Sequence, residues 1–129
     1  MKSNYKLMLT AVGAFALGAF AVQGLHAQMK PPVFIVGEVT VKDEAGYKSE
    51  WLPKIQPIIK ESGGKYLAGG FNKTWTQMGD DPPNRVVVIQ WPSMDDFKAY
   101  AEKTTPMFKG EGSKYGTYRI YAVEGVEQK

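Results

Sequence analysis

The sequence predicts an α+β fold: a ferredoxin-like βαββαβ sandwich, in which two helices cover one face of a four-stranded antiparallel sheet. Three observations predict it. The chain alternates strand-like and helix-like segments in that order. Its two most apolar strands are the first and the third, which this topology places at the centre of the sheet. The composition, 43% hydrophobic and 22% charged, is that of a globular domain rather than a disordered chain.

The N-terminal segment has the pattern of a secretory signal peptide. Lys2 and Lys6 give a basic start, and the run Leu7–Val22 carries no charge. Ala27 is the small residue that precedes the expected cleavage, with a cut after Gly24 as the alternative. A basic start, a short apolar core and a small residue at the exit are the three parts of such a signal.

The domain boundaries follow from this segment: residues 1–27 form the signal peptide and residues 28–129 form the folded domain. The protein is therefore expected to be periplasmic or secreted. The alternative is a retained membrane anchor, because the uncharged run is close to the lower limit for a spanning helix, about 20 residues. Association with a membrane is expected only if the segment is retained.

Residue types exclude several kinds of chemistry. The chain has no Cys, and its one histidine, His26, lies in the signal segment. The mature chain therefore lacks the side chains for a His-ligated zinc site, a Ser-His-Asp triad or an axial haem ligand. Much of the net charge of +3 leaves with the signal, and the remaining basic residues are scattered. We expect no cofactor, no metal and no nucleic-acid partner.

The first half of the domain reads as strand then helix. Val33–Val41 is β-branched and nearly continuous, which favours a buried strand. Asp43 is a plausible N-cap, and Gly63–Gly64 supplies the helix stop. Pro53 and Pro57 predict a kink, or a second helix that begins near Pro53. The helical stripe consists of Tyr47, Trp51, Ile55, Ile58, Ile59 and Ser62.

The next segment reads as a hairpin. Lys65–Phe71 is a weaker strand in which Gly69–Gly70 predicts a bulge or bend, and residues 72–77 are a possible continuation. Met78–Asn84 reads as a turn, and Arg85–Trp91 as the second strongly apolar strand.

The last segment reads as helix then strand. Ser93 with Asp96 resembles a capping box, and a helical stripe follows. Its members are Met94, Phe97, Tyr100 and Ala101. Thr104–Lys114 is expected to be irregular because of its proline and glycines, and Tyr115–Glu124 is the last strand.

Side-chain alternation along the strands indicates that both faces of the sheet are covered. The purely apolar sets fit against the helices. The other face is too apolar for open water and too polar for a simple core, which is typical of an interaction or ligand surface. Two such sheets would enclose a cavity in a dimer; a monomer with a ligand groove, or a partner protein, would also satisfy the pattern. This face holds Phe34, Val36, Glu38, Val86, Val88, Gln90, Arg119, Tyr121 and Val123.

Four segments resemble the domain of unknown function 1330 family: Gly37–Tyr47, Gly63–Gly70, Arg85–Ser93 and Val123–Gly125. The resemblance implies a small ferredoxin-like domain of the dimeric α/β barrel type, and hence a homodimer. It implies no general activity. The chain departs from the family at Thr105–Phe108, which reads TPMF where relatives usually carry an acid.

The candidate site residues lie on the strands. Glu38 is a lone acid in an apolar strand and a candidate general acid or base, although an ion pair with Arg119 is the favoured interpretation. Arg119 could instead bind a carboxylate ligand. The candidate ligand-binding set is completed by Tyr66, Gln90 and Tyr121. Arg85 is expected to form a surface pair with Asp80–Asp81, and Trp51 and Trp91 are expected in the core.

Three functions remain open on sequence alone. The leading one is an exported homodimer that binds a small, partly apolar molecule in a cavity between sheet faces. The second is a cofactor-free enzyme, an oxygenase, isomerase or lyase, that uses Glu38 with Arg119 or a tyrosine. The third is a non-catalytic protein-interaction module. Whether the protein is an enzyme stays open.

Overall fold

The computed structural model describes residues 31–126, so the predicted signal peptide lies outside the described residues. The elements in chain order are β1 (Val33–Val41), α2 (Glu44–Gly46), the π-helical turn η1 (Tyr47–Trp51), α3 (Leu52–Glu61), β2 (Lys65–Phe71), β3 (Arg85–Trp91), α4 (Met94–Lys109), the 3₁₀ turn η2 (Glu111–Lys114) and β4 (Gly116–Glu124). Within this range no helix combines the length and the apolar character that crossing a membrane requires.

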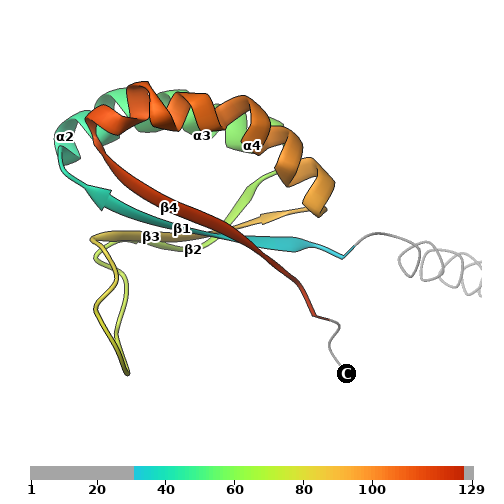
Figure 1. Cartoon of the computed structure of the whole chain (residues 1–129), viewed down its shortest axis with the longest axis horizontal. Coiled ribbons are helices and arrows are strands. Elements are labelled where there is room, and N and C mark those ends of the chain that lie inside the picture. The colour runs from blue at the N-terminus through green and yellow to red at the C-terminus, as the bar shows by residue number, and fades with distance from the viewer. Residues whose placement is uncertain (1–30, 127–129) are drawn as a thin grey trace, which may run out of the picture. The chain divides into compact units, whose positions relative to one another are not determined.

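The four strands form one antiparallel sheet in the order β2-β3-β1-β4. The helices lie on one face of this sheet, and the loop between β2 and β3 projects beyond it (Figure 1). The predicted α+β class and the central position of the first and third strands are therefore confirmed.

The strand register divides the sheet into two faces as predicted. Pairs such as Ile35 with Ile89 face the helices, and pairs such as Val36 with Val88 face the opposite way. Residues of the first kind are buried, while those of the second kind remain partly exposed. We call the second face the open face. The core lies between the sheet and the helices and consists of Val33, Ile35, Val39, Val41, Tyr47, Trp51, Ile55, Ile59, Val87, Ile89, Trp91, Tyr100 and Tyr115.

The first helical region is continuous from Glu44 to Glu61, but its hydrogen bonding changes to a π-helical turn at Tyr47–Trp51, just before Pro53. The Asp43 side chain accepts a hydrogen bond from the Gly46 N–H at 3.0 Å, as expected of a cap. α3 then begins at Leu52, near Pro53 as predicted, and carries Pro53 in its first turn directly after the π-helical turn, while Pro57 lies inside it. It ends in a Schellman motif: Gly63, at φ 101°, and Gly64 donate to the carbonyls of Lys60 and Ile59.

Two expectations about irregular segments were wrong. α4 continues to Lys109, although residues 104–114 were expected to be irregular. The reason is packing: Thr104 is buried, with its hydroxyl on the Tyr100 carbonyl, and the Phe108 ring packs against Trp51 at 5.2 Å. Residues 72–77 do not continue β2, because the strand ends at Phe71 and Asn72 turns the chain at φ 55°.

Candidate functional site

The five predicted ligand residues fall on opposite faces of the sheet. Glu38, Gln90, Arg119 and Tyr121 share the open face, since Glu38 lies opposite Arg119 and their neighbours follow the same alternation. Tyr66 lies opposite Ile89 and therefore faces the helices. The structure thus brings four of the candidates onto one surface and separates the fifth.

On the open face the predicted ion pair is present. Arg119 Nη1 lies 3.1 Å from Glu38 Oε2, and the Arg119 guanidinium lies 5.1 Å from the centre of the Tyr121 ring. The Arg119 side chain is 76% exposed and that of Glu38 is 19% exposed. A pair that reaches water in this way contributes about 0–1 kcal/mol. The geometry agrees with a structural ion pair rather than with a catalytic general acid or base.

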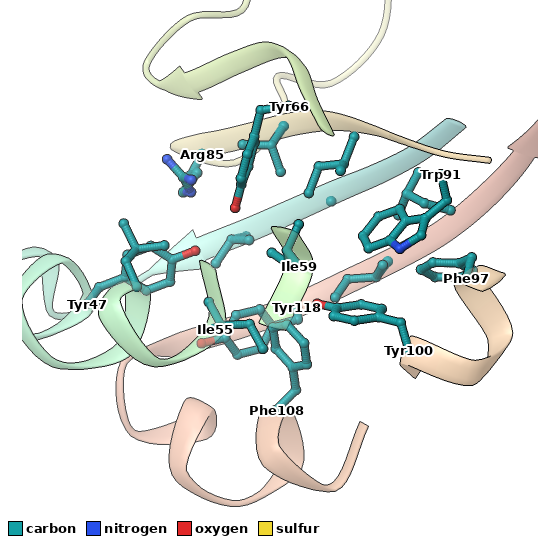
Figure 2. A pocket seen from close by; sticks show the side chains of 17 residues that line it. Tyr47, Ile55, Ile59, Tyr66, Arg85, Trp91, Phe97, Tyr100, Phe108 and Tyr118 are labelled. Atoms are coloured by element: carbon teal, nitrogen blue, oxygen red, sulfur yellow. The ribbon is translucent and has the colours of Figure 1, made fainter. Parts of the chain in front are cut away.

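The side of the sheet under the helices contains a pocket (Figure 2). Its volume is about 50 Å³, and its walls are mainly aromatic and aliphatic. Trp91, Phe97 and Tyr100 lie at one end, whereas Tyr47, Tyr66 and Arg85 point toward one another at the other end (Figure 2). The pocket therefore has an apolar end and a polar end, and β2, β3, α3 and α4 each contribute to its wall.

Arg85 is the residue that the sequence analysis placed wrongly. It was expected to pair with Asp80–Asp81 at the surface, but it is only 7% exposed and lines the pocket. Its guanidinium lies 4.8 Å from the Phe71 ring centre and 5.5 Å from that of Tyr47. None of the salt bridges among residues 31–126 includes Arg85. Its Nε is buried without a hydrogen-bond partner there.

Asn84 explains how the chain holds Arg85 in this place. The Asn84 side chain accepts a hydrogen bond from the Val41 N–H at 2.8 Å and donates one to the Val41 carbonyl at 3.0 Å. These two bonds take the place of the backbone hydrogen bonds that a neighbouring strand residue would make to Val41. Pro82 and Pro83 cannot donate such bonds because proline has no backbone N–H. Arg85 then pairs with Val39 as the first residue of β3, with its side chain on the helix side.

The tyrosines beside Arg85 are held protonated. Burial raises the pKa of Tyr47 and of Tyr66, and the positive charge of Arg85 offsets part of that rise. Burial also raises the pKa of Tyr100 and of Tyr118, which line the same pocket. At neutral pH these hydroxyls are therefore hydrogen-bond donors.

The polar end of the pocket can accordingly recognise a negatively charged or acceptor-rich group. It combines a permanent cation with hydroxyl donors inside an apolar wall, where hydrogen bonds to charged groups are stronger than in water. In the part of the chain that the structure describes, no cluster of three or more His, Cys, Asp or Glu residues could hold a metal ion.

A signal for Arg85 did exist in the sequence. Residue 85 has the same strand parity as Val87, Ile89 and Trp91, which were assigned to the helix side. The nearby acids favoured a surface pair instead. The rings that enclose Arg85 come from two other elements, Tyr47 from η1 and Phe71 from β2, and their approach depends on the tertiary fold.

Known structures agree with the fold. A protein of unknown function from Rhodopseudomonas palustris superposes with a TM-score of 0.58 at 12% identity, covering 84% of this chain and 93% of that one. Its methylated form gives 0.56 at 12% identity, over 83% and 90%. An EthD-like protein from Ralstonia eutropha gives 0.51 at 13% identity, over 78% and 96%. These identities support a shared fold alone.

No curated relative matches the sequence. The model of the family described as domain of unknown function (DUF1330) matches residues 32–126, which is the whole sheet together with its helices. The resemblance drawn from the four sequence segments is thereby confirmed. The chain belongs to the DUF1330 family.

Proposed function

We propose that the protein is an exported homodimeric domain that binds a small, partly apolar molecule, and that the ligand occupies the pocket between the helices and the sheet. The single observation that carries this proposal is the polarity of the pocket. Ligand sites are typically apolar hollows with a few converging polar groups, and Tyr47, Tyr66 and Arg85 converge at one end of an otherwise aromatic wall.

This location differs from the cavity between sheet faces that the sequence favoured. Four of the sequence-predicted residues lie on the open face, but the described hollow lies on the other side of the sheet. The open face is assigned instead to dimerisation. Its charged centre is the Glu38–Arg119 pair, which is neutral as a unit, so a second copy would meet no net charge there.

The exposed apolar side chains of the open face support the same assignment. Tyr121 is 39% exposed and Val123 is 49% exposed, beside the partly exposed Val36 and Val88. An isologous interface buries the same patch on both copies, so one apolar sheet face can cover another. Export rests on the sequence of residues 1–27 alone.

Native mass spectrometry of protein recovered from the periplasmic fraction tests export, dimerisation and ligand binding together. The expected result is a dimer of chains cleaved after residue 27, with a discrete additional mass that is released on unfolding. A monomer would contradict the dimer, and an uncleaved chain would contradict export in the proposed form. A dimer that retains nothing and gains no thermal stability from a panel of small metabolites would contradict ligand binding.

A further inference from the structure

We propose that the ligand of this pocket is a small monocarboxylate with a flat, apolar body, and that Arg85 binds its carboxylate. The inference rests on the proposed function and names the substrate class. It starts from the charge of the pocket. Arg85 is more than nine-tenths buried, and no carboxylate of residues 31–126 lies within ion-pair distance of it. An arginine does not lose its proton in a protein, so the buried charge persists.

The donors around Arg85 define the ligand's polar group. The unpartnered Nε–H and an adjacent Nη–H form a fork that matches the two oxygens of a carboxylate. The hydroxyls of Tyr47 and Tyr66 point toward the same place (Figure 2). Phe71 and Tyr47 hold the guanidinium by ring contacts, the Tyr47 and Tyr66 hydroxyls interact with it by hydrogen bonding, and its Nε–H is left without a partner among residues 31–126.

The charge of the ligand follows from the rest of the wall. Arg85 is the one cationic side chain among the residues that line the pocket. A monoanion neutralises one guanidinium, whereas a phosphate dianion would remain half compensated in an apolar hollow, at high cost. A monocarboxylate therefore fits the charge better than a phosphate ester.

The body of the ligand follows from the other end. Ile55, Ile59, Trp91 and Phe97 present aliphatic and aromatic surface. The volume of about 50 Å³ restricts the occupant to a small group unless a side chain moves. Tyr66 is placed to do so, because it lies on the edge strand β2 and is 39% exposed. A benzoate-sized acid meets the charge and shape requirements once Tyr66 moves outward, because a cavity that holds a benzene ring has about 150 Å³.

Benzoate and its neutral isostere benzamide test the inference as matched probes. The readouts are the dissociation constants and the ¹⁵N–¹H resonance of Arg85 Nε. We expect benzoate to bind at least ten-fold more tightly than benzamide and to shift the Arg85 Nε signal. We expect Arg85→Gln and Arg85→Met to lose that preference. Lys54→Gln removes one positive charge from an exposed position of α3 and should retain the preference.

The outcomes separate the two proposals. Equal binding of benzoate and benzamide overturns carboxylate recognition and leaves the binding function standing. Benzoate binding that survives in both Arg85 variants overturns the role of Arg85. If neither probe binds and the Arg85 Nε signal does not respond to acetate either, the carboxylate inference fails, while the mass of the native dimer decides the proposed function independently.

Discussion

The two arginines on opposite faces of the sheet are in contrasting situations. Arg119, on the open face, is largely exposed and holds the Glu38 carboxylate at 3.1 Å. Arg85, under the helices, is buried and has no carboxylate partner among residues 31–126. Water would solvate the first charge without any partner, whereas the second cannot be solvated in this way. The contrast fits a structural role for the Glu38 carboxylate, and it is the basis for the proposal that Arg85 binds a carboxylate ligand.

The largest expected difference between the faces concerns packing. Ile89→Ala removes a side chain that is 6% exposed on the helix side of β3. The free energy of unfolding of this variant should be about 2–5 kcal/mol lower than that of the wild type, because a cavity remains in the core. Urea denaturation measures the loss.

Val88→Ala is the matched control, one residue away on the open face. Its loss should be about 1 kcal/mol or less in the monomer and should depend on protein concentration if a second copy covers that face. Equal and concentration-independent losses would contradict the division into a core face and a dimer face.

The second expected effect sharpens the assignment of the open face. Val36→Asp places a charge between Val88 and Tyr121 on the central strand. Two copies of the charge would be buried together in an isologous dimer, so the dimer should weaken roughly 100-fold, or about 2.8 kcal/mol. Sedimentation equilibrium measures this change. Ser49→Asp, exposed on η1, should leave the dimer intact. An unchanged Val36→Asp dimer would place the interface elsewhere.

The third expected effect concerns pH and the aromatic helix side. Burial raises the pKa of Tyr47, Tyr66, Tyr100 and Tyr118 above the usual 10.0, and the hydrogen bond to Glu50, with burial, raises that of Tyr115 to about 12. The folded protein therefore keeps protons that the unfolded chain releases above pH 10. The stabilisation is complete below pH 10 and is lost as the pH rises through about 12.

Tyrosinate absorbance during an alkaline titration, followed together with circular dichroism, checks this prediction. Most of the absorbance should appear only as the fold is lost. Arg85→Met should raise the pKa of Tyr47 and Tyr66 further, because the offsetting charge is gone. Free ionisation of these tyrosines near pH 10 in the folded state would show that the pocket is open to water.

The smallest expected effect compares the two arginines directly. In buffer without organic anions, Arg85→Met and Arg119→Met should each change the free energy of unfolding by about 1 kcal/mol or less. The first removes an uncompensated buried charge together with its ring contacts, and the second removes a solvated pair. At a benzoate concentration ten times the dissociation constant, wild type and Arg119→Met should gain about 1.4 kcal/mol. Arg85→Met should gain nothing, and a loss of several kcal/mol without benzoate would mark Arg85 as structural.

Much of the fold could be predicted because its determinants are local. The alternation along Val33–Val41 fixes which side chains face the helices, and Pro53 and Gly63 fix where α3 begins and ends. The end of α4 could not be predicted. Pro106 and Gly110 argue locally against a helix, and the contacts of Phe108 with Trp51 and Tyr118 exist only in the folded core.

The site was harder to predict for the same reason. The Glu38–Arg119 pair follows from two strands whose alternation is visible in the sequence. The pocket requires the approach of Tyr47, Tyr66 and Phe71 to Arg85 from separate elements. Strand parity gives the side on which Arg85 lies, but it does not show that the residue is sealed by rings and left without a carboxylate.

The amide of Asn84 has a further consequence for how the molecule tolerates change. The Asn84 side chain bonds to the Val41 backbone, and the Asn84 carbonyl accepts a hydrogen bond from the Asn72 N–H at 2.8 Å. These contacts close the base of the loop between β2 and β3. These contacts at the loop base therefore fix the strand register of Arg85, which does not depend on the length of the loop. Doubling such a loop costs only about 0.6 kcal/mol in closure entropy. Residues 73–83 are thus a natural place to insert a reporter peptide while the pocket stays intact.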